Sequence, residues 1–145
     1  MSDPLPDERS KRFIAILNEK IEPGRLMNAL GHMTAGLAGG SGKSTEMCFL
    51  EYTDHDGGEH PNISHFPFIV LKAENSNQIR TVRSETIDSG IPFTDFTSTM
   101  TVGSSQEQQD ATKASAEADL EYYGICMFGD TMVLREFTKK FSLLK

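Results

Sequence analysis

The stretch Phe13-Ile14-Ala15-Ile16-Leu17, which leads through Ile21-Glu22-Pro23-Gly24 to Arg25, decides the fold of this chain. An unbroken apolar run of this length predicts a buried strand. From Arg25 onward, apolar residues recur at helical spacing and form a face for the core: Leu26, Leu30, Met33 and Leu37. The stretch therefore predicts a strand, a tight connection and an amphipathic helix.

A second stripe of the same helix carries Arg25, Asn28 and His32, roughly opposite the apolar face. The ordinary interpretation of such a stripe is a solvated polar surface. Arg25, however, lies in the first turn, where the helix dipole disfavours a cation but free backbone N–H groups favour an anion. The stripe is therefore a candidate anion-binding site.

Length and composition predict one cytoplasmic domain. The 145 residues, 37% of them hydrophobic, are enough to bury one core. We expect a disordered tail at residues 1–10 and a single α/β domain at residues 11–145. Cys48 and Cys126 lie in apolar runs without a C-x-x-C pattern, which predicts buried, reduced thiols. No stretch resembles an export signal or a membrane span of about 18 apolar residues, so no membrane partner is expected.

The net charge of −7 is unevenly distributed along the chain. Residues 1–10, 51–60 and 104–121 carry −2, −4 and −4, so the remaining residues carry +3. A modest basic surface is therefore compatible with the acidic total, although scattered Lys and Arg are usually solvated surface.

Strand and helix signals alternate after the first helix, which predicts an α/β fold. We expect a mixed, mostly parallel sheet with helices on both faces, plus an inserted strand and an exposed helix. The expected elements are strands at 46–53, 66–71, 122–128 and near 141–143, and helices at 76–89 (capped by Asn75), 104–120 (exposed) and after Asp130. The strand at 66–71 is expected at the sheet centre, beside the first strand.

Two tempting motifs fail on spacing. Residues 39–45 resemble a phosphate-binding loop, but Leu37 stands where G-x-x-x-x-G-K-[ST] requires glycine, and the segment leaves a helix instead of entering one. His55, His60 and His65 lie among acidic residues without the spacing of a known metal site, so a solvated loop is favoured and a metal site is the weaker alternative. No cofactor and no metal are expected.

Asp95 follows the second helix and is a lone carboxylate among hydroxyls, in Phe93-Thr94-Asp95-Phe96-Thr97-Ser98-Thr99. Such a carboxylate either positions water as a general base or caps the backbone of a turn. Lys72, at the end of the strand at 66–71, has a similarly open role.

These segments resemble, in the same order, motifs of the archaeal and eukaryotic type of peptidyl-tRNA hydrolase. Residues 24–32, Gly-Arg-Leu-Met-Asn-Ala-Leu-Gly-His, resemble its G-K-x-A-A-Q-x-x-H segment, and Val70-Leu71-Lys72-Ala73 resembles its V-x-K-A strand. Asp95-Phe96-Thr97-Ser98-Thr99 resembles its D-A-G-x-T turn, and residues 137–143 resemble its closing V-T-G-H-L-K-L. The chain is most similar to an uncharacterised bacterial branch of that superfamily, a domain of unknown function.

The resemblance implies ester hydrolysis, with Arg25, Asp95 and Thr99 as catalytic residues and Gly24, Asn28, His32, Lys72 and Thr97 as ligand-binding residues. Arg25 replaces the family's lysine and stays protonated, so it can anchor an anion but cannot transfer a proton. Thr97 and Ala29 replace a glycine and a glutamine of the family.

Two functions therefore remain open: a hydrolase acting on peptidyl-tRNA or a related acylated substrate, and a non-catalytic module that binds a small anion, nucleotide or partner protein. The expected partners are tRNA or a small anionic ligand, together with a second copy in a homodimer. Both functions place Arg25 and Asp95 in one shared hollow.

Overall fold

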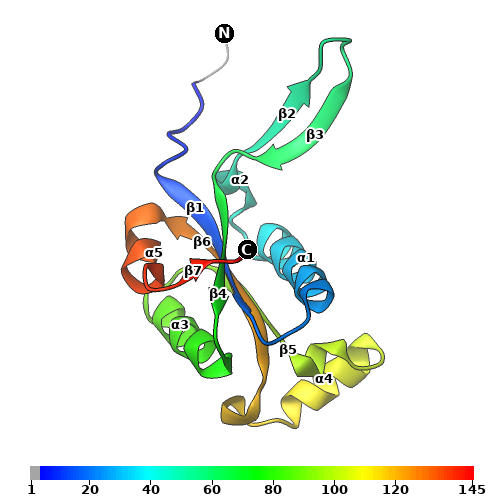
Figure 1. The fold of residues 1–145 in the computed structure, drawn as a ribbon. Helices are drawn as coiled ribbons and strands as arrows, with labels where there is room; N and C mark the ends of the chain where they lie inside the picture. The colour runs from blue at the N-terminus through cyan, green and yellow to red at the C-terminus, as the bar shows by residue number, and fades with distance from the viewer. Residues whose placement is uncertain (1–3) are drawn as a thin grey trace.

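The computed structural model describes residues 4–145, which form a five-stranded sheet with helices on both faces (Figure 1). The strand order is β5-β6-β1-β4-β7, with β1 (Lys11–Asn18) in the centre. The other strands are β4 (Phe68–Ala73), β5 (Phe93–Thr97), β6 (Tyr122–Asp130) and β7 (Ser142–Leu143). The expected position of the strand at 66–71 beside the first strand is confirmed, but β1, and not the strand at 66–71, is central.

The expectation of a mostly parallel sheet is wrong. Within the described residues, β1 and β4 pair in parallel, whereas β6 with β1, β5 with β6 and β7 with β4 pair in antiparallel fashion. A helix between two strands makes them parallel neighbours only if it crosses the sheet face. The α4 helix (Ser105–Lys113) has no buried residue and therefore does not cross the face, so β5 and β6 are antiparallel.

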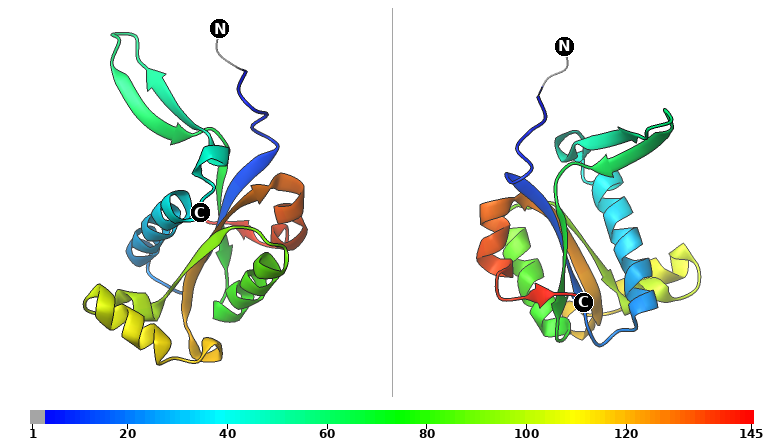
Figure 2. Two further views of the ribbon diagram at one scale, coloured as in Figure 1. Left: turned by 180° about the vertical axis from the view of Figure 1, so that it is seen from behind. Right: turned by 45° about the horizontal axis from the view of Figure 1, so that its top comes forward.

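Alternation along the strands separates two apolar layers. The α1 helix (Pro23–Gly40) covers one face, and α3 (Ser76–Asp88) and α5 (Thr131–Thr138) cover the other (Figure 2). On β1, Phe13, Ala15 and Leu17 pack toward α1, whereas Ile14 and Ile16 pack toward α3 and α5. The expected core face of α1 is confirmed, with Leu26, Met33 and Leu37 buried and Leu30 partly buried.

The segment expected as one inserted strand instead forms a short helix and a hairpin. The α2 helix (Ser44–Met47) ends at Cys48, which has a left-handed φ of 54° and redirects the chain. Among the residues that the structure describes, the strands β2 (Phe49–Thr53) and β3 (Glu59–Ser64) then pair only with each other, and they extend away from the body (Figures 1 and 2). Residues 54–58 turn the hairpin, so part of the expected polar loop is strand β3.

Several local predictions are confirmed. Asn75 caps α3 by accepting a hydrogen bond from the Gln78 N–H, and Asp130 caps α5. A reciprocal capping box at Ser104 and Glu107 starts the exposed α4 as expected, but this helix ends at Lys113 and not near residue 120. Two 3-10 turns, Ser98–Thr101 and Glu117–Asp119, flank it. Cys126 is buried as expected, but Cys48 is only half-buried.

The expected disordered tail at 1–10 remains a prediction, because residues 1–3 lie outside the described part of the chain. Residues 4–10 are largely exposed, and the Arg9 carbonyl accepts a hydrogen bond of 2.7 Å from the Thr131 hydroxyl. None of the helices within residues 4–145 has the length and apolar character needed to cross a membrane.

Candidate functional site

A hollow of about 490 Å³ lies where the start of α1 meets the end of β5 and the inner side of α4. We call it the α1 hollow. Its lining contains one cation, one imidazole and no carboxylate: Gly24, Arg25, Asn28, His32, Phe96, Met100, Thr101, Gln108 and Tyr123. The stripe predicted from helical spacing thus lines a single concave surface.

The first turn of α1 provides this hollow with hydrogen-bond donors. Pro23 occupies the start of the helix, and Glu22 makes no side-chain capping bond. The N–H groups of the next residues, Gly24 and Arg25, precede the first intrahelical bond, which the Leu26 N–H donates to the Glu22 carbonyl over 3.0 Å. Uncapped N–H groups and the positive end of the helix dipole attract an anion.

Arg25 adds a full positive charge that is available to a ligand. Its side chain is 67% exposed, and its nearest carboxylate, on Glu22, lies 3.9 Å from Nε. An exposed pair at this separation contributes little to stability. The guanidinium can therefore leave Glu22 for a planar anion, to which it can donate two parallel hydrogen bonds.

An aromatic wall faces these polar groups. Phe96 and Tyr123 are only 7% and 3% exposed, and their ring centroids are 5.6 Å apart. The His32 ring stacks on Phe96 with 6.0 Å between centroids and an interplanar angle of 24°. Phe96 reaches this position because β5 alternation turns it toward α1. The exposed His32 ring, backed by Phe96, is the part of this wall that a flat group can reach.

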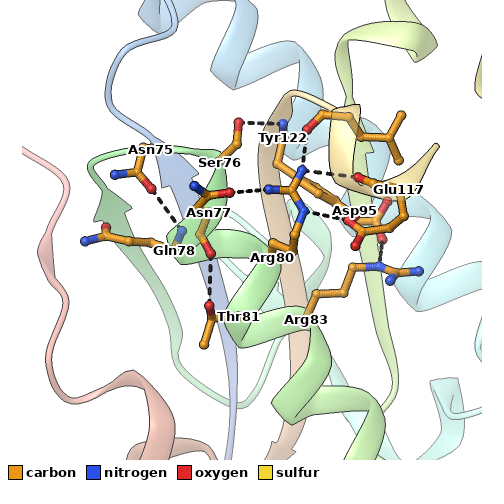
Figure 3. Close-up of polar contacts among 11 residues, drawn as sticks. Asn75, Ser76, Asn77, Gln78, Arg80, Thr81, Arg83, Asp95, Glu117 and Tyr122 are labelled. Carbon is orange, nitrogen blue, oxygen red and sulfur yellow. Dashed lines mark hydrogen bonds and ion pairs between the residues drawn. The ribbon is translucent and has the colours of Figure 1, made fainter. Parts of the chain in front are cut away.

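Asp95 lies on the opposite face of β5, and its carboxylate is bound by α3 (Figure 3). Arg83 Nε donates to Asp95 Oδ2 over 2.7 Å, and the Arg83 guanidinium also lies 5.6 Å from the Phe93 ring centroid. Burial alone would lower the pKa of Arg83, but the hydrogen bond and charge of Asp95 raise it overall. The expectation that Arg25 and Asp95 share one hollow is therefore wrong.

A second set of polar contacts on the same face joins α3 to the turn before β6 (Figure 3). Arg80 donates to Glu117 Oε2 and to the Leu120 carbonyl, each over 2.7 Å, and the Tyr122 hydroxyl donates to Glu117 over 2.9 Å. Burial, together with this acceptor, raises the pKa of Tyr122 to about 12. The hydrogen bond from Arg80 lowers the pKa of Glu117. The hydrogen-bonding groups of these residues are thus paired with one another, and their role is to fix α3 against the turn before β6.

Thr97, Thr99 and Lys72 do not line the α1 hollow either. Thr97 is fully buried, and its hydroxyl shares a 2.6 Å hydrogen bond with Thr99, whose hydroxyl lies 2.7 Å from that of Thr112 on α4. Lys72 lies at the end of β4, 3.9 Å from Glu19, in another hollow. Of the eight residues predicted for the site, the structure brings together Gly24, Arg25, Asn28 and His32.

Sequence reasoning missed the other lining side chains for identifiable reasons. Tyr123 lies in an apolar run and looks like an ordinary core residue. Met100 and Thr101 follow the hydroxyl-rich segment, and Gln108 belongs to a helix whose position no local pattern predicts. Within residues 4–145, no three His, Cys, Asp or Glu side chains are grouped closely enough to hold a metal ion.

Comparison with known proteins supports the fold and identifies the family. A solved structure of a protein of unknown function, Atu0240 from Agrobacterium tumefaciens strain C58, superposes with a TM-score of 0.80 at 14% identity, covering 94% of this chain and 98% of that one. No significant match is found among curated proteins. The family model described as "Protein of unknown function (DUF2000)" matches residues 11–145, and the chain therefore belongs to this family.

Proposed function

We propose that the α1 hollow binds an anionic ligand that carries a flat apolar group. The observation that carries this proposal is the convergence of Arg25 and the uncapped first turn of α1 on a hollow whose lining has no carboxylate. The exposed His32 imidazole, which stacks on Phe96, supports the flat group with its other face. A phosphate or carboxylate attached to an aromatic ring is the simplest ligand of this kind.

Membership of the peptidyl-tRNA hydrolase superfamily is part of the same proposal. It is supported by the strand followed by a helix that begins at Gly24-Arg25 and carries His32, and by the segment after β5 that borders the same hollow. tRNA is the corresponding candidate partner, since its 3′ end combines phosphates with flat bases.

Ester hydrolysis is the second candidate function. The observation in its favour is that His32, whose imidazole is the commonest general base in enzymes, lines the hollow beside Arg25. Asp95 is a poor candidate for positioning water because Arg83 binds its carboxylate on the other face of the sheet. Thr99 is engaged by two other hydroxyls, so His32 replaces both residues in this version of the proposal.

Calorimetric titration with inorganic phosphate and with phenyl phosphate tests the binding proposal. We expect phenyl phosphate to bind more tightly than phosphate, and Arg25→Gln to weaken it by about tenfold or more, which corresponds to the loss of a charge-assisted contact. Arg135→Gln, which removes an exposed arginine from α5 on the other face, is the matched control and should bind normally. Equal affinities of the Arg25→Gln variant and the wild type would overturn the proposal.

Peptidyl-tRNA and an N-acyl aminoacyl ester test the second function separately. Hydrolysis that is lost in His32→Gln and retained in Asp95→Asn would establish the His32 version. Binding without turnover in the wild-type protein would leave the non-catalytic module as the function.

A further inference from the structure

The hairpin of β2 and β3, residues 49–64, is the segment least explained by the fold. We call it the arm. No residue of its two strands is buried, and within residues 4–145 β2 pairs with β3 alone (Figure 2). An isolated two-stranded hairpin is at best marginally stable in water, and further strands or a packed face are needed to stabilise it. The arm therefore has the geometry of a segment that is completed by another molecule.

The two edges of the arm differ in their capacity to accept a strand. The Asp54 N–H donates to the Gly58 carbonyl, so the backbone groups of Asp54, Tyr52 and Leu50 point toward β3. Those of Phe49, Glu51 and Thr53 consequently point outward, where no described strand pairs with them. The β2 edge, which contains no proline or glycine, is open.

The outer edge of β3 is blocked. The ladder skips a residue in β3 between the pairs Leu50–Ile63 and Tyr52–His60, and Asn62 in this bulge has a left-handed φ of 45°. Pro61, beside the bulge, has no N–H to donate. Bulges and prolines are standard devices that protect an edge strand from pairing. The arm thus has one open edge and one protected edge.

One face of the arm carries three apolar side chains near its base, and His60, the partner of Tyr52, continues that face toward the tip. Leu50 and Tyr52 lie two residues apart on β2 and share a face, and Ile63 is paired with Leu50 on that face. Tyr52 and Ile63 are 51% and 58% exposed. Side-by-side pairing of two arms would double this apolar strip without changing the fold of the body.

We propose that β2 pairs in antiparallel fashion with β2 of a second copy, which makes a four-stranded sheet across a two-fold axis. Pairing through one open edge is self-complementary and stops at a dimer, because the outer edges of the product are the protected β3 strands. When the two-fold axis passes at Leu50 or at Tyr52, the outward N–H and C=O groups of one β2 strand face those of the other β2 strand. In both registers, Glu51 does not lie directly opposite Glu51 of the second copy.

The charges of the arm favour antiparallel over parallel pairing of two copies. The tip carries Asp54, Asp56 and Glu59, whereas Lys11 and Lys43 lie at the base and share one carboxylate, that of Glu46, at 3.3 and 3.4 Å. Antiparallel pairing separates the two acidic tips and directs each one toward the base of the other copy. A parallel arrangement would bring the tips together and is disfavoured.

Sedimentation analysis of the full chain combined with amide hydrogen exchange tests this dimer. We expect a concentration-dependent dimer in which the Glu51 amide is protected, with the Asp54 amide protected in both states because its bond is internal to the arm. Glu51→Pro should weaken dimerisation by about 30-fold, since each copy loses a donor across the axis.

Tyr52→Lys should also weaken the dimer, and Met132→Lys, at a somewhat more exposed apolar position on α5, should not. A wild-type protein that stays monomeric would overturn the proposal. So would a dimer in which the outward amides exchange freely.

Discussion

Replacement of Asp95 by asparagine distinguishes a structural carboxylate from a catalytic one. Asp95 and Arg83 are 16% and 31% exposed, and their 2.7 Å contact is a charge-assisted hydrogen bond. An amide of the same shape keeps an acceptor but removes the charge, which we expect to cost about 1–2 kcal/mol of unfolding free energy. For a chain of this length, such a loss lowers the midpoint of thermal unfolding by about 3–8 °C.

Urea and thermal unfolding of Asp95→Asn, Arg83→Met and the double variant measure this effect. The double variant should be destabilised by less than the sum of the two single variants, because both remove the same contact. Asp88→Asn, at an exposed position near the end of the same helix, is the control and should change stability by less than about 0.5 kcal/mol. Asp95→Asn should bind phenyl phosphate normally. Wild-type stability together with lost binding or turnover in Asp95→Asn would refute the structural interpretation.

Three further predictions concern the core and the helix ends. Gly124→Ala should lower the free energy of unfolding in urea by about 1–3 kcal/mol, because the added Cβ would lie 2.9 Å from the Ile16 carbonyl oxygen. An unchanged free energy of unfolding would show that β1 and β6 move apart at little cost. Asp130→Ala should cost about 1 kcal/mol by the same measurement, since two N–H groups of α5 lose their acceptor; an unchanged value would contradict this role. Burial raises the pKa of the Cys126 thiol to about 12. At pH 8 a disulfide reagent should therefore modify Cys48 alone as long as the protein stays folded. Rapid modification of both thiols in the folded protein would contradict the burial of Cys126.

The elements that could be predicted from the sequence are those whose own pattern determines them. The apolar runs of β1 and β6 and the helical spacing of α1 are local signals, and so are the caps at Asn75, Ser104 and Asp130. An apolar run does not indicate whether β6 is parallel or antiparallel to β1, because a buried strand has a similar composition in either orientation. The sequence of β5, with its hydroxyls and carboxylate, is instead typical of a turn, because this strand lies at the sheet edge, where the apolar alternation is weak.

The candidate site shows the same division. Arg25, Asn28 and His32 share one surface because the helix itself places them there. The side of Asp95 depends on strand alternation: once Phe96 packs against α1, its neighbour must face the other layer. The side of the sheet on which Asp95 lies can be predicted only when residues 93–97 are known to form a strand. Gln108 joins the hollow through the tertiary position of α4, which no local pattern specifies.

The way the arm is attached has a consequence for the evolution of the chain. The His65 N–H donates to the Cys48 carbonyl over 2.8 Å, so the arm leaves and re-enters the body at one point. Shortening such an excursion changes the entropy of closing the loop by little, and the contacts between β1 and β4 do not involve it. The arm is therefore free to lengthen, shrink or disappear among related proteins while the sheet keeps its register.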